Sequence, residues 1–160
     1  MATNMYAANR ALFDRLKQVV AEAQPGSPLA EFGVEYVWPG DTVAGARCIY
    51  GGRLSFDQPG EDDAVDGNDE LPAEIAALMV HIEARVSPFP DAGLRASDEL
   101  VEEAGFVLRR LLAREPHICG GASVARIRSG EGTRMPIDDA AVSRLSLRVE
   151  VTSYVDYRDA

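Results

Sequence analysis

The sequence predicts one α+β domain, in which an antiparallel or mixed β-sheet carries two helices packed on one face. Two stretches place apolar residues three and four positions apart, as amphipathic helices do, and several others alternate apolar and polar residues as strands do. So few helices beside consecutive strands are typical of the α+β class. The expected order is α-β-β-β-(acidic loop)-β-α-β-β, and the 160 residues fit a single domain without an internal repeat.

The first part of the chain predicts a helix followed by three strands. Residues 3–23 carry one apolar stripe at helical spacing, and a Gln-Pro-Gly sequence ends the helix. A strand is expected at 32–38, where β-branched and aromatic residues alternate along one face. Further strands are expected at 47–50 and 53–56. The two glycines between these strands fit either a tight hairpin or a bulge.

A long acidic loop is expected at about 57–74. It contains proline and glycine but neither Lys nor Arg, which is typical of a solvated connection. Its Asp residues superficially resemble a calcium-binding loop, but Ala64 and Ala73 stand where oxygen ligands are required. A solvated loop is therefore the preferred interpretation. Its acidic residues are Asp57, Glu61, Asp62, Asp63, Asp66, Asp69, Glu70 and Glu74.

The second part of the chain predicts a long strand, a second helix and two closing strands. The strand is expected at 75–86, and its alternate residues face the core. The helix is expected at 97–114, where Gly105 is an unusual interior residue that would permit a close approach by the sheet. The closing strands are expected at 123–129 and 141–155, joined by a loop that fills the residues between them.

The charge and hydropathy of the chain exclude some classes of protein. The net charge is −10 and the isoelectric point is about 4.6. Such a charge repels nucleic acid and argues against a DNA-reading protein, but it suits a surface past which DNA must slide without binding. No apolar run approaches the roughly 20 residues of a membrane span, and the first residues lack the pattern of a secretory signal. Synthesis in the cytoplasm is therefore expected.

Residues that could carry chemistry are few and scattered. Cys48 and Cys119 lie in separate apolar stretches, which favours two buried, reduced thiols over a disulfide or a metal pair. His81 and His117 have no partner at metal-ligand spacing. Glycine-rich phosphate loops and the G-x-S-x-G sequence are absent. The sequence thus predicts a protein that is not an enzyme and that has no catalytic, cofactor-binding or metal site.

Several short sequences occur in an order that carries a family resemblance. LFDRLK lies in the first helix, VEYVWPGD ends the first strand, CIYGG follows, HIEARVSP ends the long strand, and EPHICGG follows the second helix. The sharpest pieces are the WPGD turn at 38–41, IYGG at 49–52 and the turn at 116–121. This order resembles the tail terminator proteins of long-tailed, siphovirus-type bacteriophages, particularly those of actinobacterial hosts. The resemblance covers nearly the whole chain, 1–160.

The resemblance implies a structural role in a virion. Such proteins form a hexameric ring at the head-proximal end of a finished tail tube, where they stop polymerisation and present a surface to the head connector. The expected partners are other copies of the chain, the tail tube protein and the connector or adaptor protein, and DNA passes only through the lumen. The chain would be assembled in the host cytoplasm and would reside in the tail or neck, without a membrane or a cofactor.

The resemblance also suggests which residues meet partners. The single tryptophan reads either as a core residue that caps the sheet or as an interface anchor, and the acidic loop would line the lumen or lie at a ring face. A head–tail connector or stopper is the nearest alternative, followed by a small cytoplasmic ligand-binding domain and then an enzyme with a dispersed site. The residues assigned to a partner or ring interface are Trp38, Pro39, Asp41, Arg148, Glu150 and Thr152.

Overall fold

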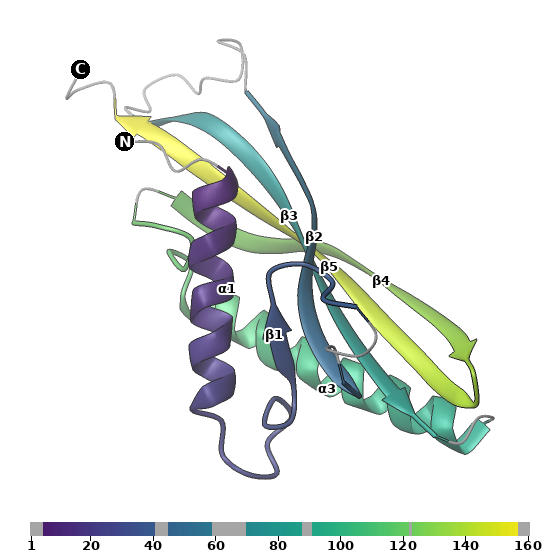
Figure 1. Cartoon of the computed structure of the whole chain (residues 1–160). Coiled ribbons are helices and arrows are strands. Elements are labelled where there is room, and N and C mark those ends of the chain that lie inside the picture. Colours follow the sequence, from purple (N-terminus) through teal and green to yellow (C-terminus); the bar gives the residue numbers. More distant parts are fainter. Residues whose placement is uncertain (1–4, 41–44, 59–69, 88–90, 122, 157–160) are drawn as a thin grey trace.

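The computed structural model is an α+β domain with a five-stranded mixed sheet and two helices, as the sequence predicts (Figure 1). It describes residues 5–40, 45–58, 70–87, 91–121 and 123–156. The elements are α1 (Met5–Ala21), β1 (Gly33–Glu35), β2 (Arg47–Asp57), β3 (Glu70–Val86), α3 (Asp91–Arg114), β4 (Ser123–Ile137) and β5 (Ala140–Asp156).

The sheet has the strand order β1-β2-β3-β5-β4, so the two longest strands lie at its centre. β3 and β5 pair in antiparallel register from Glu70 opposite Asp156 to Val86 opposite Ala141. β2 and β4 join this pair on either side, also antiparallel, whereas the short β1 pairs with β2 in parallel. β1 and β4 are therefore the two edges of the sheet, and they differ greatly in length.

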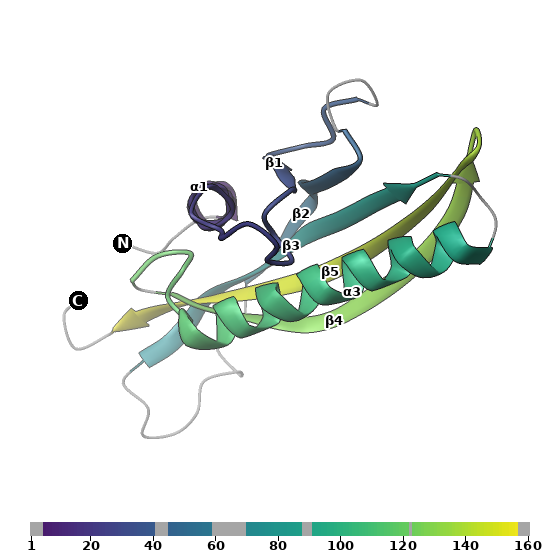
Figure 2. The ribbon, with the colours of Figure 1, turned by 90° about the horizontal axis from the view of Figure 1, so that it is seen from below.

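Both helices pack on one face of the sheet and share one hydrophobic core. Even-numbered residues of β3 face the helices because strand side chains alternate between faces. Figure 2 shows α3 running along the sheet, with α1 seen end-on. Arg15 of α1 donates to Glu115, just after α3, and this ties the two helices together. Buried core residues include Leu12, Phe13, Leu16, Leu78, Val80, Ile82, Ala104, Leu108, Leu112, Leu147 and Val149.

Residues 47–57 form one strand rather than two. The register of β2 against β3 shifts between Gly51 and Leu54, so the predicted glycine bulge is present and the hairpin alternative is not formed. The same irregularity shortens β1. Its parallel pairing ends at Glu35 opposite Tyr50, immediately before Gly51, and not at residue 38 as the sequence predicted.

Three predicted boundaries are wrong because the elements extend further than the local patterns indicate. β3 begins at Glu70, since its first residues pair with the end of β5, so the acidic loop is shorter than 57–74. The predicted loop between the closing strands is mostly strand, because β5 provides partners up to Ile137 opposite Ala140. α3 begins at Asp91 rather than at residue 97. The hydroxyl of Ser97 donates to the Leu94 carbonyl and so is satisfied inside the helix.

Two glycines permit close approaches that a side chain would block. A Cβ at Gly51 would collide with the backbone carbonyl of Tyr36, and a Cβ at Gly105 would collide with the side chain of Leu145 on β5. The second contact confirms the expected close approach of helix and sheet. The first is the stricter constraint, because a backbone carbonyl cannot move aside as a leucine methyl group can.

We expect Gly51→Ala to lower the free energy of unfolding by about 1–3 kcal/mol, the usual cost of forcing an extra carbon into a packed site. Urea denaturation followed by circular dichroism measures this. Gly132→Ala is the matched control, since a Cβ there meets no atom within 4 Å. Its unfolding free energy should change by less than about 0.5 kcal/mol. Equal effects of the two substitutions would contradict the steric explanation.

Candidate assembly surfaces

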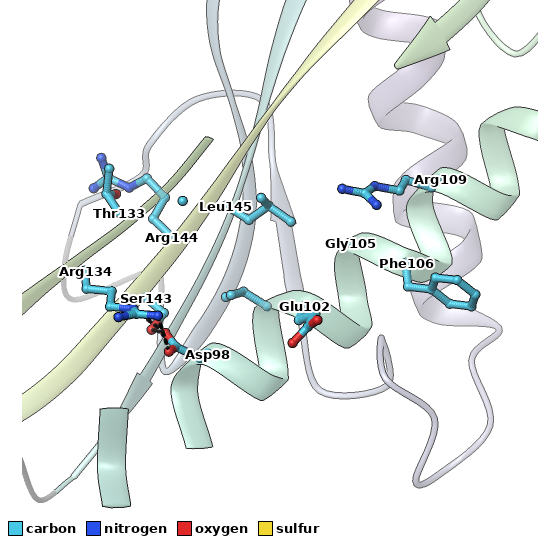
Figure 3. Close-up of a pocket in the computed structure, with 12 residues that line it drawn as sticks. Asp98, Glu102, Gly105, Phe106, Arg109, Thr133, Arg134, Ser143, Arg144 and Leu145 are labelled. Atoms are coloured by element: carbon cyan, nitrogen blue, oxygen red, sulfur yellow. Dashed lines mark hydrogen bonds and ion pairs between the residues drawn. The ribbon is translucent and has the colours of Figure 1, made fainter. Parts of the chain in front are cut away.

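A groove runs between α3 and the edge strand β4. It consists of two open hollows of about 560 and 580 Å³ that share Arg109. The groove exists because α3 packs against β3 and β5, while β4 carries glycines at 130 and 132 that fill little space. We call these two hollows the α3–β4 groove. The first is lined by residues such as Asp98, Glu102, Gly105, Phe106, Arg134 and Leu145 (Figure 3).

A polar contact holds the turn end of the β4–β5 hairpin against α3. The Asp98 carboxylate accepts hydrogen bonds from Ser143 at 2.6 Å and from Arg134 at 3.2 Å. The Ser143 hydroxyl also lies 2.7 Å from that of Ser97. These contacts join α3, β4 and β5 at one point, so the carboxylate that closes this end of the α3–β4 groove is already neutralised by Arg134.

The second hollow is basic. It is lined by Arg109, Leu112, Ala113, Pro116 and residues 124–130, which include Arg126 and Arg128 but no acidic residue. We call it the basic hollow. Arg128 pairs with Glu150 at 3.5 Å, and the register places the exposed Arg126 opposite the same glutamate on the helix-free face. Arg109 is exposed on the helix side and forms no ion pair with another described residue. A chain of net charge −10 thus places a positively charged surface beside its longest edge strand.

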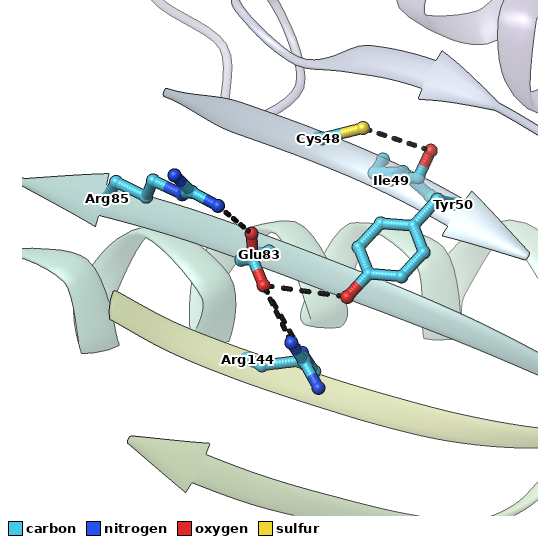
Figure 4. Close-up of polar contacts among 6 residues, drawn as sticks. All are labelled: Cys48, Ile49, Tyr50, Glu83, Arg85 and Arg144. Carbon is cyan, nitrogen blue, oxygen red and sulfur yellow. Dashed lines mark hydrogen bonds and ion pairs between the residues drawn. The ribbon is translucent and has the colours of Figure 1, made fainter. Parts of the chain in front are cut away.

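The helix-free face of the sheet carries a second polar cluster (Figure 4). Glu83 of β3 is only 3% exposed and accepts hydrogen bonds from Arg144 at 3.0 Å and Arg85 at 3.4 Å. The Tyr50 hydroxyl lies 3.5 Å from the same carboxylate. A buried carboxylate requires such partners, because removing an unpaired charge from water is costly. We call Glu83 and these three partners the Glu83 cluster.

Trp38 covers the edge of the Glu83 cluster. Its ring lies 4.9 Å from that of Tyr50, and the Arg85 guanidinium lies 5.6 Å above it. The tryptophan is half-buried and packs with Cys48 and Tyr50 outside the main core. This position agrees with the prediction of a residue that caps the sheet. The interface role assigned to Trp38 stays a prediction.

Burial favours the neutral forms of Tyr50, Cys48 and His81 on this face. It raises the pKa of Tyr50 to about 12, with the Glu83 carboxylate adding to the effect, and that of the Cys48 thiol to about 11. It also lowers the pKa of His81, in the same direction as the nearby Arg144. Cys119 is likewise a buried free thiol, with its pKa raised to about 12. Both cysteines are therefore protonated thiols at neutral pH, as expected of structural residues.

The predicted interface residues do not form one cluster. Arg148 is exposed on the helix-free face of β5, and Glu150 and Thr152 lie farther along that face. Trp38 lies on the same face but beyond it, against Tyr50 of β2, and the half-buried Pro39 follows it in the chain. Asp57 ends β2 and Glu70 begins β3. The other assigned residues lie outside the described part of the chain: Asp41, Glu61, Asp62, Asp63, Asp66 and Asp69.

Sequence reasoning missed both the groove and the cluster. Both depend on contacts between residues that are distant in the sequence. Strand register brings Glu83 opposite Arg144, and helix packing brings Asp98 beside Ser143. The one local signal was Phe106, which is apolar yet lies outside the buried stripe of the second helix; its side chain is 58% exposed at the groove.

Comparison with known proteins does not assign the chain to a family. No family model and no curated protein matches it. Within the described residues there is no group of three or more His, Cys, Asp or Glu side chains that could hold a metal ion. Among the described helices, none has the length and apolar character needed to cross a membrane. The candidate function therefore depends on the surfaces described above.

We expect Glu83→Gln to lower the free energy of unfolding by about 2–3 kcal/mol, because two arginines would lose their buried partner. The cost stays below that of a fully buried pair, since Arg144 is one-third exposed. Chemical denaturation provides the measurement. Glu131→Gln is the control, because Glu131 is exposed and lies outside the Glu83 cluster. A neutral effect at residue 83 would show that the cluster does not stabilise the fold.

We expect stability to fall as the pH drops through 6.5, the usual histidine value, because His81 has a lower pKa when folded. Below this pH the unfolded chain binds more protons than the folded chain, so the free energy of unfolding decreases as the pH falls. The decrease ends once the pH is below the pKa of His81 in the folded chain. Thermal unfolding between about pH 7.5 and 5.5 measures the slope. His81→Asn should reduce this slope. If the stability of the wild type and of His81→Asn depended equally on pH, His81 would not be the residue responsible.

Proposed function

We propose that this chain is a structural subunit of a bacteriophage tail. In this proposal it forms a ring at the head-proximal end of the tail tube, ends tube growth and joins the tail to the head connector, while DNA passes through the lumen. The order of short sequences that resembles tail terminator proteins supports this role. The observation that carries it is the presence of two unlike, exposed edges on one sheet.

Unlike edges are what a ring subunit requires. A closed ring larger than a dimer uses a heterologous contact, in which one surface of each copy meets a different surface of the next. Here β4 offers a strand of fifteen residues beside the α3–β4 groove, whereas β1 offers three residues in parallel pairing. A long edge and a short edge cannot be equivalent, so this sheet favours a directional contact over a symmetric one.

Exposed apolar side chains accompany both edges. Val37 follows β1 and is 65% exposed, while Phe106 lies at the α3–β4 groove and is 58% exposed. Met135 on β4 is 38% exposed. Apolar side chains at the centre of a contact supply most of its binding energy. These three residues therefore mark two candidate halves of one subunit contact.

The surface charge and the shape of the hollows support assembly over the alternatives. A net charge of −10 suits a ring whose lumen must not hold DNA phosphates. A ligand-binding domain would need a concave pocket that surrounds most of a small molecule. The two described hollows are open grooves beside an edge strand, which fit an extended polypeptide better.

The test measures the mass of the purified chain over a range of concentrations, with negative-stain microscopy of the same samples. We expect rings of six copies. Val37→Asp and Phe106→Asp should each abolish rings, because each introduces a charge into one half of the contact. Tyr6→Asp is the control, since Tyr6 is 60% exposed on α1 and lines neither hollow of the α3–β4 groove. It should leave the rings intact.

A mixture of the two edge variants separates a heterologous contact from a symmetric one. The Phe106→Asp variant keeps Val37, and the Val37→Asp variant keeps Phe106. One copy of each can therefore pair through these two residues, and the pair cannot grow further. We expect dimers in the mixture and monomers in each variant alone. A wild-type chain that stays monomeric, or that forms only a twofold dimer, would contradict the proposed ring.

A further inference from the structure

We propose that the basic hollow and the outer side of β4 bind the acidic segment at 57–70 of a neighbouring copy, which is added to the sheet as an extra strand. This inference rests on the self-association in the proposed function and not on the tail role itself. Three observations support it. The outer side of β4 has no neighbouring strand in the sheet, the basic hollow lies beside this strand, and the arginines there favour an acidic occupant.

The edge is built to repel another copy of itself. Arg126 and Arg128 lie on β4, and the register of the strand shifts between Ile127 and Ser129. Charged residues and irregular register are the devices that prevent two exposed edges from pairing. Two β4 strands paired antiparallel about Ile127 would oppose Arg126 to Arg128. The same residues attract a strand that carries carboxylates, because opposite charges on neighbouring strands stabilise a sheet.

Basic residues flank both faces of the place that an added strand would occupy. Arg109 projects from α3 on the helix side. On the opposite side, Arg128 pairs with Glu150, which shares the helix-free face of β5 with Arg148. Side chains of a strand alternate between faces, so an acidic strand can place carboxylates near arginines on both. Leu112 and Val124 provide the apolar part of the hollow.

The chain contains one segment of matching chemistry. Residues 57–70 hold seven carboxylates and neither Lys nor Arg, whereas three arginines border the basic hollow, Arg109 on the helix side and Arg126 and Arg128 beside Glu150 on the other face. The segment follows Asp57 at the end of β2 and precedes Glu70 at the start of β3. Outside residues 57–74, no stretch of this length has so many acidic residues without a basic one.

The occupant must come from another copy because the chain is too short to reach its own β4. Residues 58–69 begin and end on the neighbouring strands β2 and β3, so half of them at most can reach outward, about 20 Å. The outer side of β4 lies three strand spacings beyond β3, about 15 Å in projection. Too little chain then remains to lie along β4 and return. A neighbouring copy has no such limit.

The first experiment measures binding of a fluorescent peptide with the sequence 57–70 to the full-length chain. We expect salt-sensitive binding that weakens about tenfold or more in Arg109→Glu/Arg126→Glu. Arg10→Glu/Arg95→Glu is the matched control, because both arginines are exposed elsewhere and the change in net charge is equal. The neutral pair Arg109→Gln/Arg126→Gln should show a smaller loss, and unfolding curves confirm that each variant is folded.

The second experiment exchanges the charges. Asp62→Lys/Asp63→Lys/Asp66→Lys should weaken assembly, and combining these changes with Arg109→Glu/Arg126→Glu in one chain should restore it to within a few fold of wild type. Restoration supports a direct contact, because two independent defects would instead add. If wild type assembles but exchange fails to restore assembly, the strand contact is wrong while the ring stands.

Other outcomes are equally decisive. Absence of wild-type assembly together with charge-dependent peptide binding would refute the ring and support the basic hollow as the site. A scrambled acidic peptide that binds as tightly as the natural one would overturn the choice of this segment. So would a single-stranded DNA probe that binds at Arg109 and Arg126 while the peptide does not, since the surface would then bind phosphate.

Discussion

The antiparallel pairing of β3 with β5 is the constraint on which the rest of the structure depends. It runs from Glu70 opposite Asp156 to Val86 opposite Ala141, and each neighbouring strand adds to one side of it. On one face, its alternate residues form the floor of the core beneath both helices. On the other, the same register places Glu83 opposite Arg144 and makes a buried carboxylate tolerable. A shift of one residue would exchange the two faces.

Local sequence patterns predicted the elements well but not their ends. Amphipathic spacing located both helices, and alternation located part of every strand. The ends depended on partners far away in the chain. Residues 130–137, rich in glycine and charge, form strand only because β5 lies beside them. Glu70 begins β3 for the same reason, although an acidic stretch with proline has little strand propensity of its own.

The candidate surfaces were harder to predict, for a related reason. The sequence placed Met79, His81, Glu83 and Arg85 on one face of a strand, and this assignment agrees with the structure. It gave no means to choose which arginine would meet Glu83, because that choice is made by strand register. The α3–β4 groove arises from what β4 lacks, at Gly130 and Gly132, and from where α3 lies. Absent side chains leave only a weak sequence signal.

The contact of Asp98 with Arg134 and Ser143 has a mechanical consequence. The β4–β5 hairpin is long, and at its turn end this one carboxylate fastens it to the helix. Together with the contact of Ser97 with Ser143 and the packing of Leu145 against Gly105, it helps to set the inclination of the hairpin relative to α3. In an assembly built on β4, that inclination would be passed to the neighbouring subunit, so the Asp98 contact bears on the curvature of such an assembly.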